Sequence, residues 1–418
     1  MPKFKMPSRK VLRTIYRTGW LNVWEGSVRS SKTLISTVAW LVYISECDDK
    51  YFLMTGKTLG SLLRNVFEGD MGIKAMIPGA QYVQTAKGNA ILIPTPKGVK
   101  TCYCFGGNNA NSYQSIRGVT VAGWYADEVS EQHPDTIIEC FNRTVVSSDR
   151  RHFWTLNPCN PKHAIYTEYL DKYDAMTKEE RRTAGGYYWH HFTLEDNPGI
   201  SQKEMEALKM QYTGFAYDRY ILGLRVVAEG LIYPFIDDSH FPAFNPRDVE
   251  CRYASIDFGT NHPTVMYIGG PYRGDRSDWR IAYEYYDEKS GKDTRDYTED
   301  FIKMCTDHDI DPHKVIIAID PSARALKNSF IKAGLTIMDA DNSVLDGINF
   351  TYRVLNKHKL TLHCSCIHAH REFGTYAWDP KASERGEEKP IKLGDDCMDS
   401  LRYFAHTFMS YMEKGEYQ

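Results

Sequence analysis

The chain lacks the features that mark membrane-spanning and secreted proteins. No run of about 18 apolar residues occurs in it, so we expect no membrane-spanning helix. Its N-terminal segment, MPKFKMPSRK, is basic but has no apolar stretch, so we do not expect a signal peptide. Ten cysteines without a secretion signal predict reduced thiols in a cytoplasm.

The chain also lacks a dominant charge of one sign. The formal net charge is -3, from 51 Lys and Arg against 54 Asp and Glu. Overall basicity therefore does not indicate nucleic-acid binding, and any such contact must come from local patches. No internal repeat or low-complexity tract occurs. With 418 residues, of which 42% are hydrophobic, the composition predicts an ordinary globular protein of two or three domains.

The first half of the chain alternates strand-like and helix-like segments. Short apolar runs between turn residues indicate strands, and longer segments indicate helices. The expected strands are 20–24, 51–55, 81–85, 90–94, 102–107, 121–128, 152–158 and 187–194, and the expected helices are 32–47 and 59–67. This alternation predicts an α/β domain over residues 1–195, with a mostly parallel sheet and helices on both faces.

The second half begins after a looser region, 196–245, which is rich in Pro, Asp and aromatic residues and which we assign as a linker region. Residues 246–418 then form the second expected domain. Its expected strands are 252–259, 264–270, 279–288, 314–320, 335–340 and 359–364, with helices at 294–307, between the later strands, and twice at the C-terminal end. Three consecutive strands followed by helix–strand alternation predict an RNase H-like α/β fold.

A phosphate-binding loop is indicated at the end of the first strand. Gly26 to Thr33 reads GSVRSSKT, which is the P-loop pattern G-x4-G-K-T with Ser31 in place of the second Gly. The loop follows a strand and opens a helix, so backbone N–H groups can surround phosphates there. In this interpretation Lys32 reaches the β- and γ-phosphates of ATP and Thr33 holds Mg²⁺.

Two later strand ends supply the remaining parts of an ATPase site. Asp127 and Glu128 end an apolar strand, as in a Walker B pair, where the Asp binds Mg²⁺ and the Glu polarises the attacking water. Two exposed carboxylates at a strand end are the simpler alternative. Asn157, in the Thr-Leu-Asn-Pro segment 155–158, ends the next strand and can sense the γ-phosphate, although this segment taken alone favours a plain turn.

A second group of carboxylates lies in the C-terminal half. Asp257 lies in the middle of an apolar strand-like run and Asp320 ends another, while 395–399 reads DDCMD. If a helix begins at Asp395, Asp396 and Asp399 share one of its faces. A charged Asp in an apolar strand is unfavourable unless its charge is compensated, so the group predicts a divalent-metal site. Oxygen ligands favour Mg²⁺ or Mn²⁺, and two ions at such a site cleave phosphodiesters.

Together the first group of motifs resembles the ATPase domain of the large subunits of tailed-phage terminases, which is an ASCE-type P-loop ATPase. Members of that family carry an Arg in the P-loop, matched here by Arg29, and a Thr/Ser-x-Asn-Pro segment, matched by 155–158. The family also has a Tyr-x-x-Gly segment, matched here by 220–223. In the family this Gly is often followed by Glu-Trp, whereas Leu224 and Arg225 follow it here. Segments 116–118, 192–193 and 196–198 match as well. The resemblance implies nucleotide contacts at Gly26, Arg29, Ser31, Lys32, Thr33, Asp127 and Asn157.

The C-terminal half resembles the nuclease domain of the same family, so the resemblance spans nearly the whole chain. These domains typically end with Asp-His-x-x-Asp-Ala-x-Arg-Tyr, where residues 395–403 here read DDCMDSLRY. Asp396 replaces the family His. The resemblance implies catalytic metal ligands at Asp257, Asp320 and Asp396, with Asp399 as the alternative direct ligand to Asp396. Glu284 is either an outer ligand or a surface carboxylate.

The resemblance also implies a biological role and partners. Family members package viral double-stranded DNA into procapsids by ATP hydrolysis and cut concatemeric DNA with a metal-dependent endonuclease. Their partners are the portal protein, the small terminase subunit and the procapsid, and they act as a ring, here expected to be a pentamer, with a monomer when free. The expected location is the cytoplasm of the infected bacterium and not the mature virion. Arg143 is either an arginine finger acting on a neighbouring subunit or a surface residue.

Other features carry less weight. The spacing of HCSCIHAH at 363–370 fits no standard zinc site. Cys102 and Cys104 alternate on an expected strand and are interpreted as buried thiols. The basic residues of the first 17 positions either touch DNA or nucleotide or form a solvated charged segment. Two rival functions remain: a repair-type ATP-dependent nuclease, and a nucleotide-gated assembly factor without nuclease activity.

Overall fold

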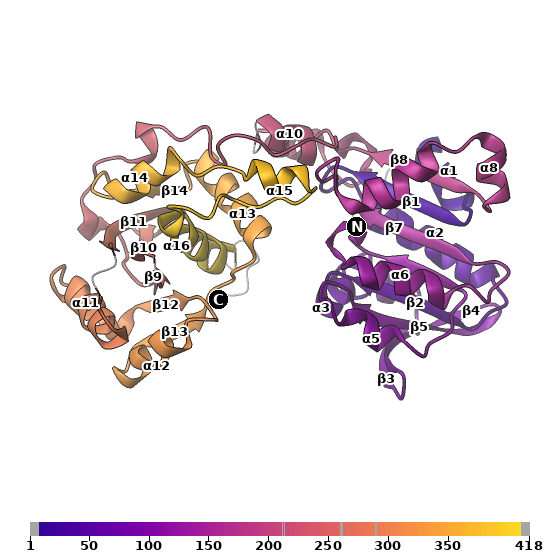
Figure 1. The fold of residues 1–418 in the computed structure, drawn as a ribbon, viewed down its shortest axis with the longest axis horizontal. Helices are drawn as coiled ribbons and strands as arrows, with labels where there is room; N and C mark the ends of the chain where they lie inside the picture. The colour runs from indigo at the N-terminus through magenta and orange to yellow at the C-terminus, as the bar shows by residue number, and fades with distance from the viewer. Residues whose placement is uncertain (1–7, 211, 213, 260–261, 289–290, 411–418) are drawn as a thin grey trace. The chain divides into compact units, whose positions relative to one another are not determined.

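The computed structural model describes residues 8–210, 212, 214–259, 262–288 and 291–410 (Figure 1). They form two compact units, of which the first ends at Val227 and the second begins at Ala228. The first unit therefore extends 32 residues past the expected domain end at 195, and the expected linker region is divided between the two units. Within the described ranges, no helix has the length and apolar character needed to cross a membrane.

The first unit is built on an eight-stranded sheet with the strand order β3-β4-β5-β2-β6-β7-β1-β8. Its strands are β1 (Leu21–Gly26), β2 (Tyr51–Gly56), β3 (Gln81–Thr85), β4 (Gly88–Thr95), β5 (Gly98–Gly106), β6 (Gly123–Ala126), β7 (Arg151–Leu156) and β8 (Tyr187–Phe192). The six strands β5, β2, β6, β7, β1 and β8 are neighbours in that order and run parallel to one another. Strands β4 and β3 extend the sheet beyond β5 in antiparallel pairs. The expected mostly parallel sheet is confirmed. Strand β7 lies between β1, which leads into the P-loop, and β6, which Asp127 and Glu128 follow, as in ASCE-type ATPases.

The helices of this unit cover both faces of the sheet. They are α1 (Arg9–Tyr16), α2 (Lys32–Glu46), α3 (Leu59–Leu62), α4 (Ile73–Met76), α5 (Ser112–Ile116), α6 (Pro134–Arg143), α7 (Asp171–Asp174), α8 (Lys178–Thr183), α9 (Gln202–Lys209) and α10 (Gly214–Tyr220), with π-helical turns η1 (Leu63–Glu68) and η3 (Ile165–Leu170). Alternate side chains of β2 enter different cores: Phe52 and Met54 pack with Trp40 of α2, whereas Leu53 packs with Trp124 and Ile137 on the other face. This alternation follows from the two-residue period of a strand.

The second unit is built on a six-stranded sheet with the order β13-β12-β9-β10-β11-β14. Its strands are β9 (Tyr253–Asp257), β10 (Thr264–Tyr272), β11 (Asp275–Asp287), β12 (Ile316–Ile319), β13 (Thr336–Asp339) and β14 (Leu360–Leu362). Strands β9, β10 and β11 are antiparallel neighbours, and β12 and β13 continue the sheet parallel to β9. This is the RNase H-like order expected from the sequence.

The helices of the second unit are α11 (Thr294–Thr306), α12 (Arg324–Lys332), α13 (Val344–Asn356), α14 (Ile367–Phe373), α15 (Pro380–Glu384) and α16 (Asp396–Phe404), followed by the π-helical turn η8 (Ala405–Met409). Helix α16 is buried along its whole length and packs against β9 and β10. Its N-terminus therefore lies beside the sheet, which brings Asp396 and Asp399 toward the end of β9.

Short 3-10 turns connect some of these elements, and the remaining differences from expectation are local. The turns are η2 (Val129–Glu131), η4 (Leu194–Asp196), η5 (Asp238–His240), η6 (Pro246–Asp248) and η7 (Pro312–Lys314). The expected helix 59–67 is divided into α3 and the π-helical η1. The basic N-terminal segment, for which no element was expected, forms α1 from Arg9, with the side chain of Ser8 accepting a hydrogen bond from the N–H of Val11 at 3.2 Å. Lys3 and Lys5 lie outside the described residues.

Candidate functional sites

The P-loop joins β1 to α2, and its backbone conformation restricts which residues fit at several of its positions. A side chain at Gly26 would place Cβ 1.8 Å from the carbonyl oxygen of Phe192, so only glycine fits there. Arg29 and Ser31 have φ angles of 53° and 65°, in the left-handed region. Ser31 thus adopts the conformation that the usual second glycine of the motif adopts without strain. It is the N-cap of α2 but its side chain makes no capping hydrogen bond, which leaves the helix N-terminus accessible to an anion.

Lys32 is turned inward at the start of α2. Its Nζ donates to the carbonyl oxygens of Gly26 at 3.1 Å and Ser27 at 2.7 Å, and to Oδ1 of Asn157 at 2.9 Å. Burial lowers the pKa of Lys32 to about 8, although nearby carboxylates, foremost Glu128, oppose that shift. The ammonium is therefore held by neutral oxygen atoms that a phosphate can replace.

The two carboxylates expected to act with Lys32 follow β6. Asp127 is 2% exposed, and it accepts hydrogen bonds from Thr155 at 2.8 Å, Asn65 at 2.9 Å and Thr33 at 3.4 Å. Burial raises the pKa of Asp127. Glu128 has a left-handed φ of 51°, and its N–H donates to Oγ1 of Thr155 at 3.0 Å. Asp127 is therefore not an exposed strand-end carboxylate but is aimed at the P-loop.

Three segments that match the terminase family converge on the backbone of the P-loop. The carbonyl of Phe192 accepts from the N–H of Ser27 at 2.9 Å, and that of Tyr220 accepts from the N–H of Val28 at 3.0 Å. Asn197 donates through its side chain to the carbonyl of Arg29 at 2.7 Å. The segments around Asn197 and Tyr220, both within the expected linker region, are thus attached to the P-loop of the first unit.

The first unit also contains a buried ion pair next to the P-loop. Arg225 donates to both oxygens of Glu25, with Nε–Oε1 at 3.0 Å and Nη2–Oε2 at 2.6 Å. Tyr166 and Trp189 donate to the same carboxylate at 2.6 and 2.7 Å. Glu25 directly precedes Gly26, so this network holds the end of β1. The sequence indicated a departure from the family at Arg225 but not its partner.

Arg143, at the end of α6, forms a 3.1 Å ion pair with Glu139 one turn earlier in the same helix. This pairing neither requires nor excludes a neighbouring subunit, so both interpretations stay open. Cys102 and Cys104, on β5, are both fully buried, as expected, and burial raises the pKa of both thiols.

The carboxylates of the second unit meet in a cleft of about 920 Å³. Asp257 ends β9, Asp320 directly follows the neighbouring parallel strand β12, and Asp396 begins α16. Asp257, Asp396 and His262 each present one potential ligand atom, and these atoms lie within 4.8 Å of one another. Nδ1 of His262 lies 2.5 Å from Oδ1 of Asp396. No sequence pattern indicated His262.

Two of the cleft carboxylates, Asp257 and Asp320, differ in the groups that surround them. Burial, and next the charges of Asp399 and Asp396, raise the pKa of Asp257 well above its usual range. Burial alone would raise the pKa of Asp320, but hydrogen bonds from Ser322, Tyr403 and Asn342 lower it overall. The negative charge of the cleft is thus concentrated at buried positions that favour a cation.

Asp399 is held by two basic side chains. Arg402 donates to its Oδ1 at 2.9 Å and Lys392 donates to its Oδ2 at 2.6 Å. Lys392 also contacts Asp395 at 2.8 Å. The expected shared face of Asp396 and Asp399 is confirmed by α16, with Asp395 as its N-cap, but in this structure only Asp396 belongs to the three-residue ligand group.

Two buried glutamates accept hydrogen bonds from backbone N–H groups at the starts of α14 and α16. The Glu284 side chain is 3% exposed and accepts from the N–H groups of His368 and Ala369 at 3.0 and 2.9 Å, so it caps α14. It is therefore not a surface carboxylate. Glu372 of α14 accepts from the N–H of Cys397 at 2.8 Å at the start of α16, and burial raises the pKa of Glu372 to about 7. No sequence pattern indicated Glu372.

The His- and Cys-rich stretch 363–370 is used within the fold. His363 contacts Ser365 at 2.7 Å, His368 contacts Glu284 at 3.0 Å, and Cys366 is fully buried. Among the residues that the structure describes, the group of three side chains arranged as potential metal ligands lies in the cleft and not here.

Comparison with solved structures identifies the family. The large terminase from a thermophilic bacteriophage is 32% identical to this chain, with a TM-score of 0.87, and the match covers 97% of this chain and 100% of that one. This chain belongs to the terminase large-subunit family. A family sequence model described as terminase large subunit, T4likevirus-type, N-terminal, matches residues 32–238. As a large terminase subunit, the chain has the ATPase-type and RNase H-like domain architecture expected from its sequence.

Two further structures of the same phage protein are similar over nearly the whole chain. One, in complex with ADP, is 31% identical with a TM-score of 0.86 and covers 96% of this chain and 99% of that one. The other, in complex with ATP-gamma-S, is 32% identical with a TM-score of 0.84 and the same coverage. A comparison with curated proteins gives no significant match.

Proposed function

We propose that the first unit hydrolyses ATP at the P-loop and thereby drives the packaging of double-stranded viral DNA into procapsids. The observation that carries this proposal is that three separate segments meet at the P-loop: Lys32 donates to Asn157, and Asp127 accepts from Thr33 and Thr155. A relative with nearly the same architecture is solved with ADP and with ATP-gamma-S, which supports nucleotide binding at this position.

The residues present fit a magnesium ion at this site. The hydroxyl of Thr33 and the buried carboxylate of Asp127 lie 3.4 Å apart, and both are hard oxygen ligands. The pKa of Asp127 is raised by burial, which indicates that its charge lacks full compensation within the protein. Mg²⁺ bound there would neutralise charge on the transferred phosphoryl group.

The chain's own residues then have distinct roles. On nucleotide binding, Lys32 exchanges its oxygen partners within the protein for phosphate oxygens, and the N-terminus of α2 with the loop around Arg29 and Ser31 surrounds the phosphates. Glu128 orients the attacking water and accepts its proton. Asn157 senses the loss of the γ-phosphate, because Lys32 returns to it when the phosphate leaves. Asn157 thereby couples hydrolysis to a change in structure.

Phosphate release from ATP by the purified full-length protein tests this assignment. Lys32→Ala and Glu128→Gln should each lower kcat at least roughly 100-fold, because each removes a group that acts on the transferred phosphate or the water. Lys74→Ala, at an exposed position of α4, is the matched control and should leave kcat unchanged. Hydrolysis that survives in both site variants would contradict the assignment.

We also propose that the cleft of the second unit is a metal-dependent DNA endonuclease site that cuts concatemeric DNA. Asp257, Asp320 and Asp396 would hold Mg²⁺ or Mn²⁺, with two ions expected, and His262 lies within reach of the same position. The buried, mutually repelling carboxylates fit a cation there. The bound ions would activate a water and stabilise the leaving oxygen of the phosphodiester. Because Arg402 and Lys392 already hold Asp399, we assign the direct contact to Asp396 and a positioning role to Asp399.

Cleavage of supercoiled plasmid in Mg²⁺ or Mn²⁺ tests the nuclease assignment. Wild type should cut and Asp320→Ala should not, since Asp320 lines the cleft at the end of β12. Equal inactivity of both proteins across salt and protein concentrations would favour the rival function of a nucleotide-gated assembly factor. Equal cutting by both would show that the activity comes from another site.

The family assignment supports the wider biological role. We propose that the subunit acts in the cytoplasm of the infected bacterium with the portal protein, the small terminase subunit and the procapsid, and that several copies form a ring, expected to be a pentamer, around the duplex. Contacts to DNA should be made mainly to phosphates and should weaken with salt.

A further inference from the structure

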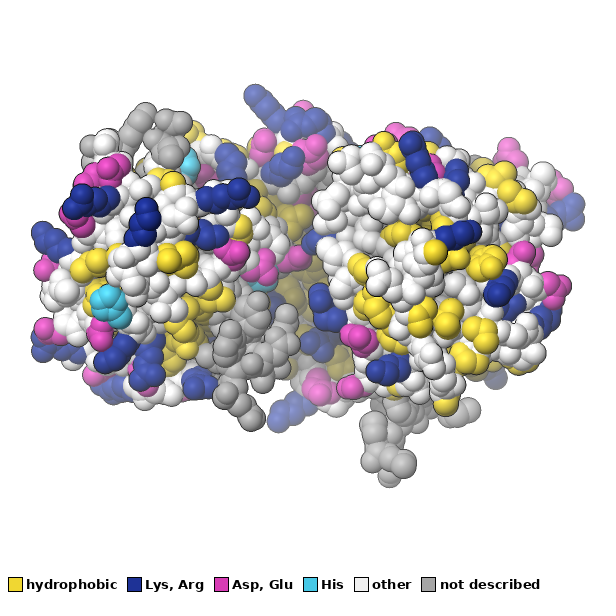
Figure 2. Space-filling model, turned by 90° about the horizontal axis from the view of Figure 1, so that it is seen from below, with side chains coloured by type: hydrophobic (Ala, Val, Ile, Leu, Met, Phe, Trp, Pro, Cys, Tyr) yellow, Lys and Arg dark blue, Asp and Glu magenta, His cyan; other side chains and the backbone are white. Residues whose placement is uncertain are grey.

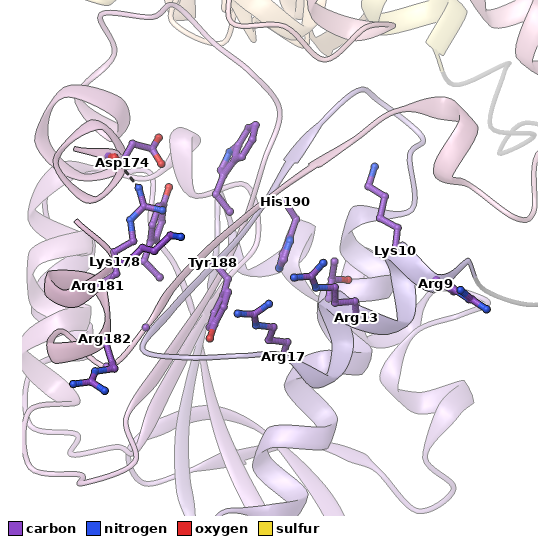
Figure 3. Close-up of a pocket in the computed structure, with 15 residues that line it drawn as sticks. Arg9, Lys10, Arg13, Arg17, Asp174, Lys178, Arg181, Arg182, Tyr188 and His190 are labelled. Carbon is purple, nitrogen blue, oxygen red and sulfur yellow. Dashed lines mark hydrogen bonds between the residues drawn. The ribbon is translucent and has the colours of Figure 1, made fainter. Parts of the chain in front are cut away.

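A cavity of about 1020 Å³ in the first unit takes no part in the P-loop site. It lies between α1 on one side and α8 on the other, and its floor is β8, the last strand of the sheet. Figure 3 shows the basic side chains of α1 on one side of Tyr188 and His190 and those of α8 on the other. We call this cavity the basic groove. Its lining side chains that carry charge are Arg9, Lys10, Arg13, Arg17, Lys178, Arg181, Arg182 and Asp174.

The sequence of α1 explains one wall. Val11, Thr14 and Ile15 are buried, and α1 packs against α2, while Arg9, Arg13 and Arg17 recur at four-residue spacing on the exposed side. One face of the helix therefore anchors it to the unit and the other presents cations to the groove. The second wall is the short segment Lys178–Thr183, in which Lys178 and Arg182 are exposed.

The positive charge in the groove is only partly compensated. Lys10 pairs with Asp196 at 2.5 Å and Arg182 with Glu179 at 2.8 Å. Among the described residues, no carboxylate oxygen lies within 4 Å of the charged nitrogen atoms of Arg13 or Lys178. Elsewhere, basic and acidic side chains are interspersed over the face seen in Figure 2. In a chain of net charge -3, this groove is therefore a local concentration of positive charge.

The floor contributes flat side chains and no opposing charge. Burial, and next the nearby cations Arg13, Lys10 and Arg17, lower the pKa of His190 to about 4, so it is neutral at pH 7. The guanidinium of Arg17 lies 5.2 Å from the ring centre of Tyr188, and Trp189 is 39% exposed. Lys and Arg side chains clustered along one groove are typical of surfaces that bind nucleic-acid backbones.

We propose that the basic groove is a nucleic-acid-binding site that holds backbone phosphates of the duplex without reading base sequence. This inference rests on the proposed function in taking duplex DNA as the polymer that the subunit handles. Five of the seven cations are arginines, whose planar guanidinium groups donate two hydrogen bonds to one phosphate. An acidic protein segment is the competing occupant, and its carboxylates lie less regularly spaced than the phosphates of a duplex, which carries one negative charge per about 1.7 Å of its axis.

Binding of a fluorescently labelled duplex of about 30 base pairs, followed by anisotropy, tests the proposal. The full-length protein is titrated in EDTA without nucleotide, so that neither ATP hydrolysis nor DNA cleavage enters the result. The metal-free acidic cleft of the second unit repels phosphates under these conditions. Arg13→Glu/Lys178→Glu changes one exposed cation on each wall. Lys74→Glu/Lys87→Glu is the matched control, because it makes the same charge change at exposed positions of the same unit outside the groove.

We expect the groove variant to raise the Kd at least tenfold and to reduce the slope of log Kd against log salt by about two, since two phosphate contacts are lost. The control should change the Kd less than threefold. Equal weakening by both double variants, an unchanged groove variant, or no binding by wild type at about 50 mM salt would each overturn the proposal.

A parallel titration with polyglutamate distinguishes the competing occupant. If polyglutamate binding depends on Arg13 and Lys178 while DNA binding does not, the groove binds an acidic protein and the proposal is wrong. Circular dichroism establishes that the variants are folded, and Arg13→Gln/Lys178→Gln replaces the charge reversal if it unfolds the unit. In that case a Kd within twofold of wild type would overturn the proposal. Neither readout requires ATPase or nuclease activity, so failure of the proposed function would be seen separately.

Discussion

Arg225 forms a bidentate ion pair with Glu25, the residue that directly precedes the P-loop. Glu25 is 1% exposed and Arg225 has 24% of its side chain exposed, so the pair is largely removed from water. The ring of Tyr166 lies 4.1 Å from the Arg225 guanidinium and also donates its hydroxyl to Glu25. The segment after α10 is thereby fixed to the end of β1, where a displacement would move the phosphate-binding loop.

Loss of Arg225 should therefore destabilise the first unit. Arg225→Ala leaves a buried carboxylate without a cation, which typically costs about 3–5 kcal/mol. Glu25→Gln/Arg225→Ala should recover at least half of that loss, because the neutral amide can accept from Trp189 through its oxygen and donate to the Tyr166 hydroxyl through its NH2 group. Urea unfolding followed by tryptophan fluorescence measures both. A loss below about 1 kcal/mol in the single variant, or an equal loss in the double variant, would count against this explanation.

Asn157 should control how readily Lys32 leaves its hydrogen bond to the protein and binds the phosphates of ATP. In the structure Lys32 donates to the Asn157 amide oxygen at 2.9 Å. Asn157→Asp is nearly the same size but places a negative charge against the ammonium, so it should weaken ATP binding about tenfold or more. Asn157→Ala should change the Kd less than threefold while lowering kcat roughly 10- to 100-fold, as expected when a hydrogen bond to the charged Lys32 is lost. Calorimetric ATP binding and phosphate release separate the two effects. Equal ATP affinities in the two variants would contradict the role given to Asn157.

His152 should make the first unit sensitive to acid. It is 1% exposed, and burial, followed by the nearby charge of Arg150, lowers its pKa from 6.5 to about 3. The folded protein therefore keeps His152 neutral down to about pH 3, whereas the unfolded chain protonates it below about pH 6.5. Between these values the unfolded state binds more protons, so stability falls as pH falls, by up to about 1.4 kcal/mol per pH unit from this residue.

The free energy of unfolding, measured from pH 8 to pH 4 for wild type and His152→Gln, tests this. Each protein is normalised to its own value at pH 8, where His152 is neutral in both states. The variant should lose less stability on acidification than wild type. Parallel curves for the two proteins would show that His152 does not contribute.

Asp257 should lower the stability of the metal-free second unit. Its buried carboxylate faces those of Asp396 and Asp399, and burial and repulsion together raise its pKa well above the usual range. Asp257→Asn removes that charge at almost constant volume. In EDTA we expect its Tm to exceed that of wild type by roughly 2–4 °C, which corresponds to about 1 kcal/mol. Millimolar Mn²⁺ should raise the Tm of wild type but not of the variant. A lower Tm of Asp257→Asn in EDTA would contradict the prediction.

Much of this arrangement could be predicted because it depends on strand order. The sequence pattern places Asp320 at the end of one strand and Asp257 inside another. In the structure Asp257 ends β9, and the carboxyl ends of the adjacent parallel strands β9 and β12 bring both carboxylates to one edge of the sheet. The P-loop and Asp127 similarly follow β1 and β6 at one edge of the first sheet. Such contacts follow from the periodicity and the direction of the strands.

Contacts made by loops and buried ion pairs could not be predicted in this way. His262 reaches Asp396 from the turn between β9 and β10, and Lys392 reaches Asp399 from the segment before α16. Neither position is set by a periodic pattern. Glu25 lies in a fully buried strand, and its partner is 200 residues away, so only the folded chain shows why the charge is tolerated there.

Plasmid cleavage in Mn²⁺ without ATP, measured together for wild type, Asp257→Asn and Glu128→Gln, tests whether one chain carries two separate catalytic sites. We predict that Asp257→Asn abolishes cleavage while Glu128→Gln cuts at the wild-type rate, although Glu128→Gln no longer hydrolyses ATP. Cleavage by Asp257→Asn at the wild-type rate, or its complete loss in a folded Glu128→Gln variant, would contradict the assignment of two independent sites.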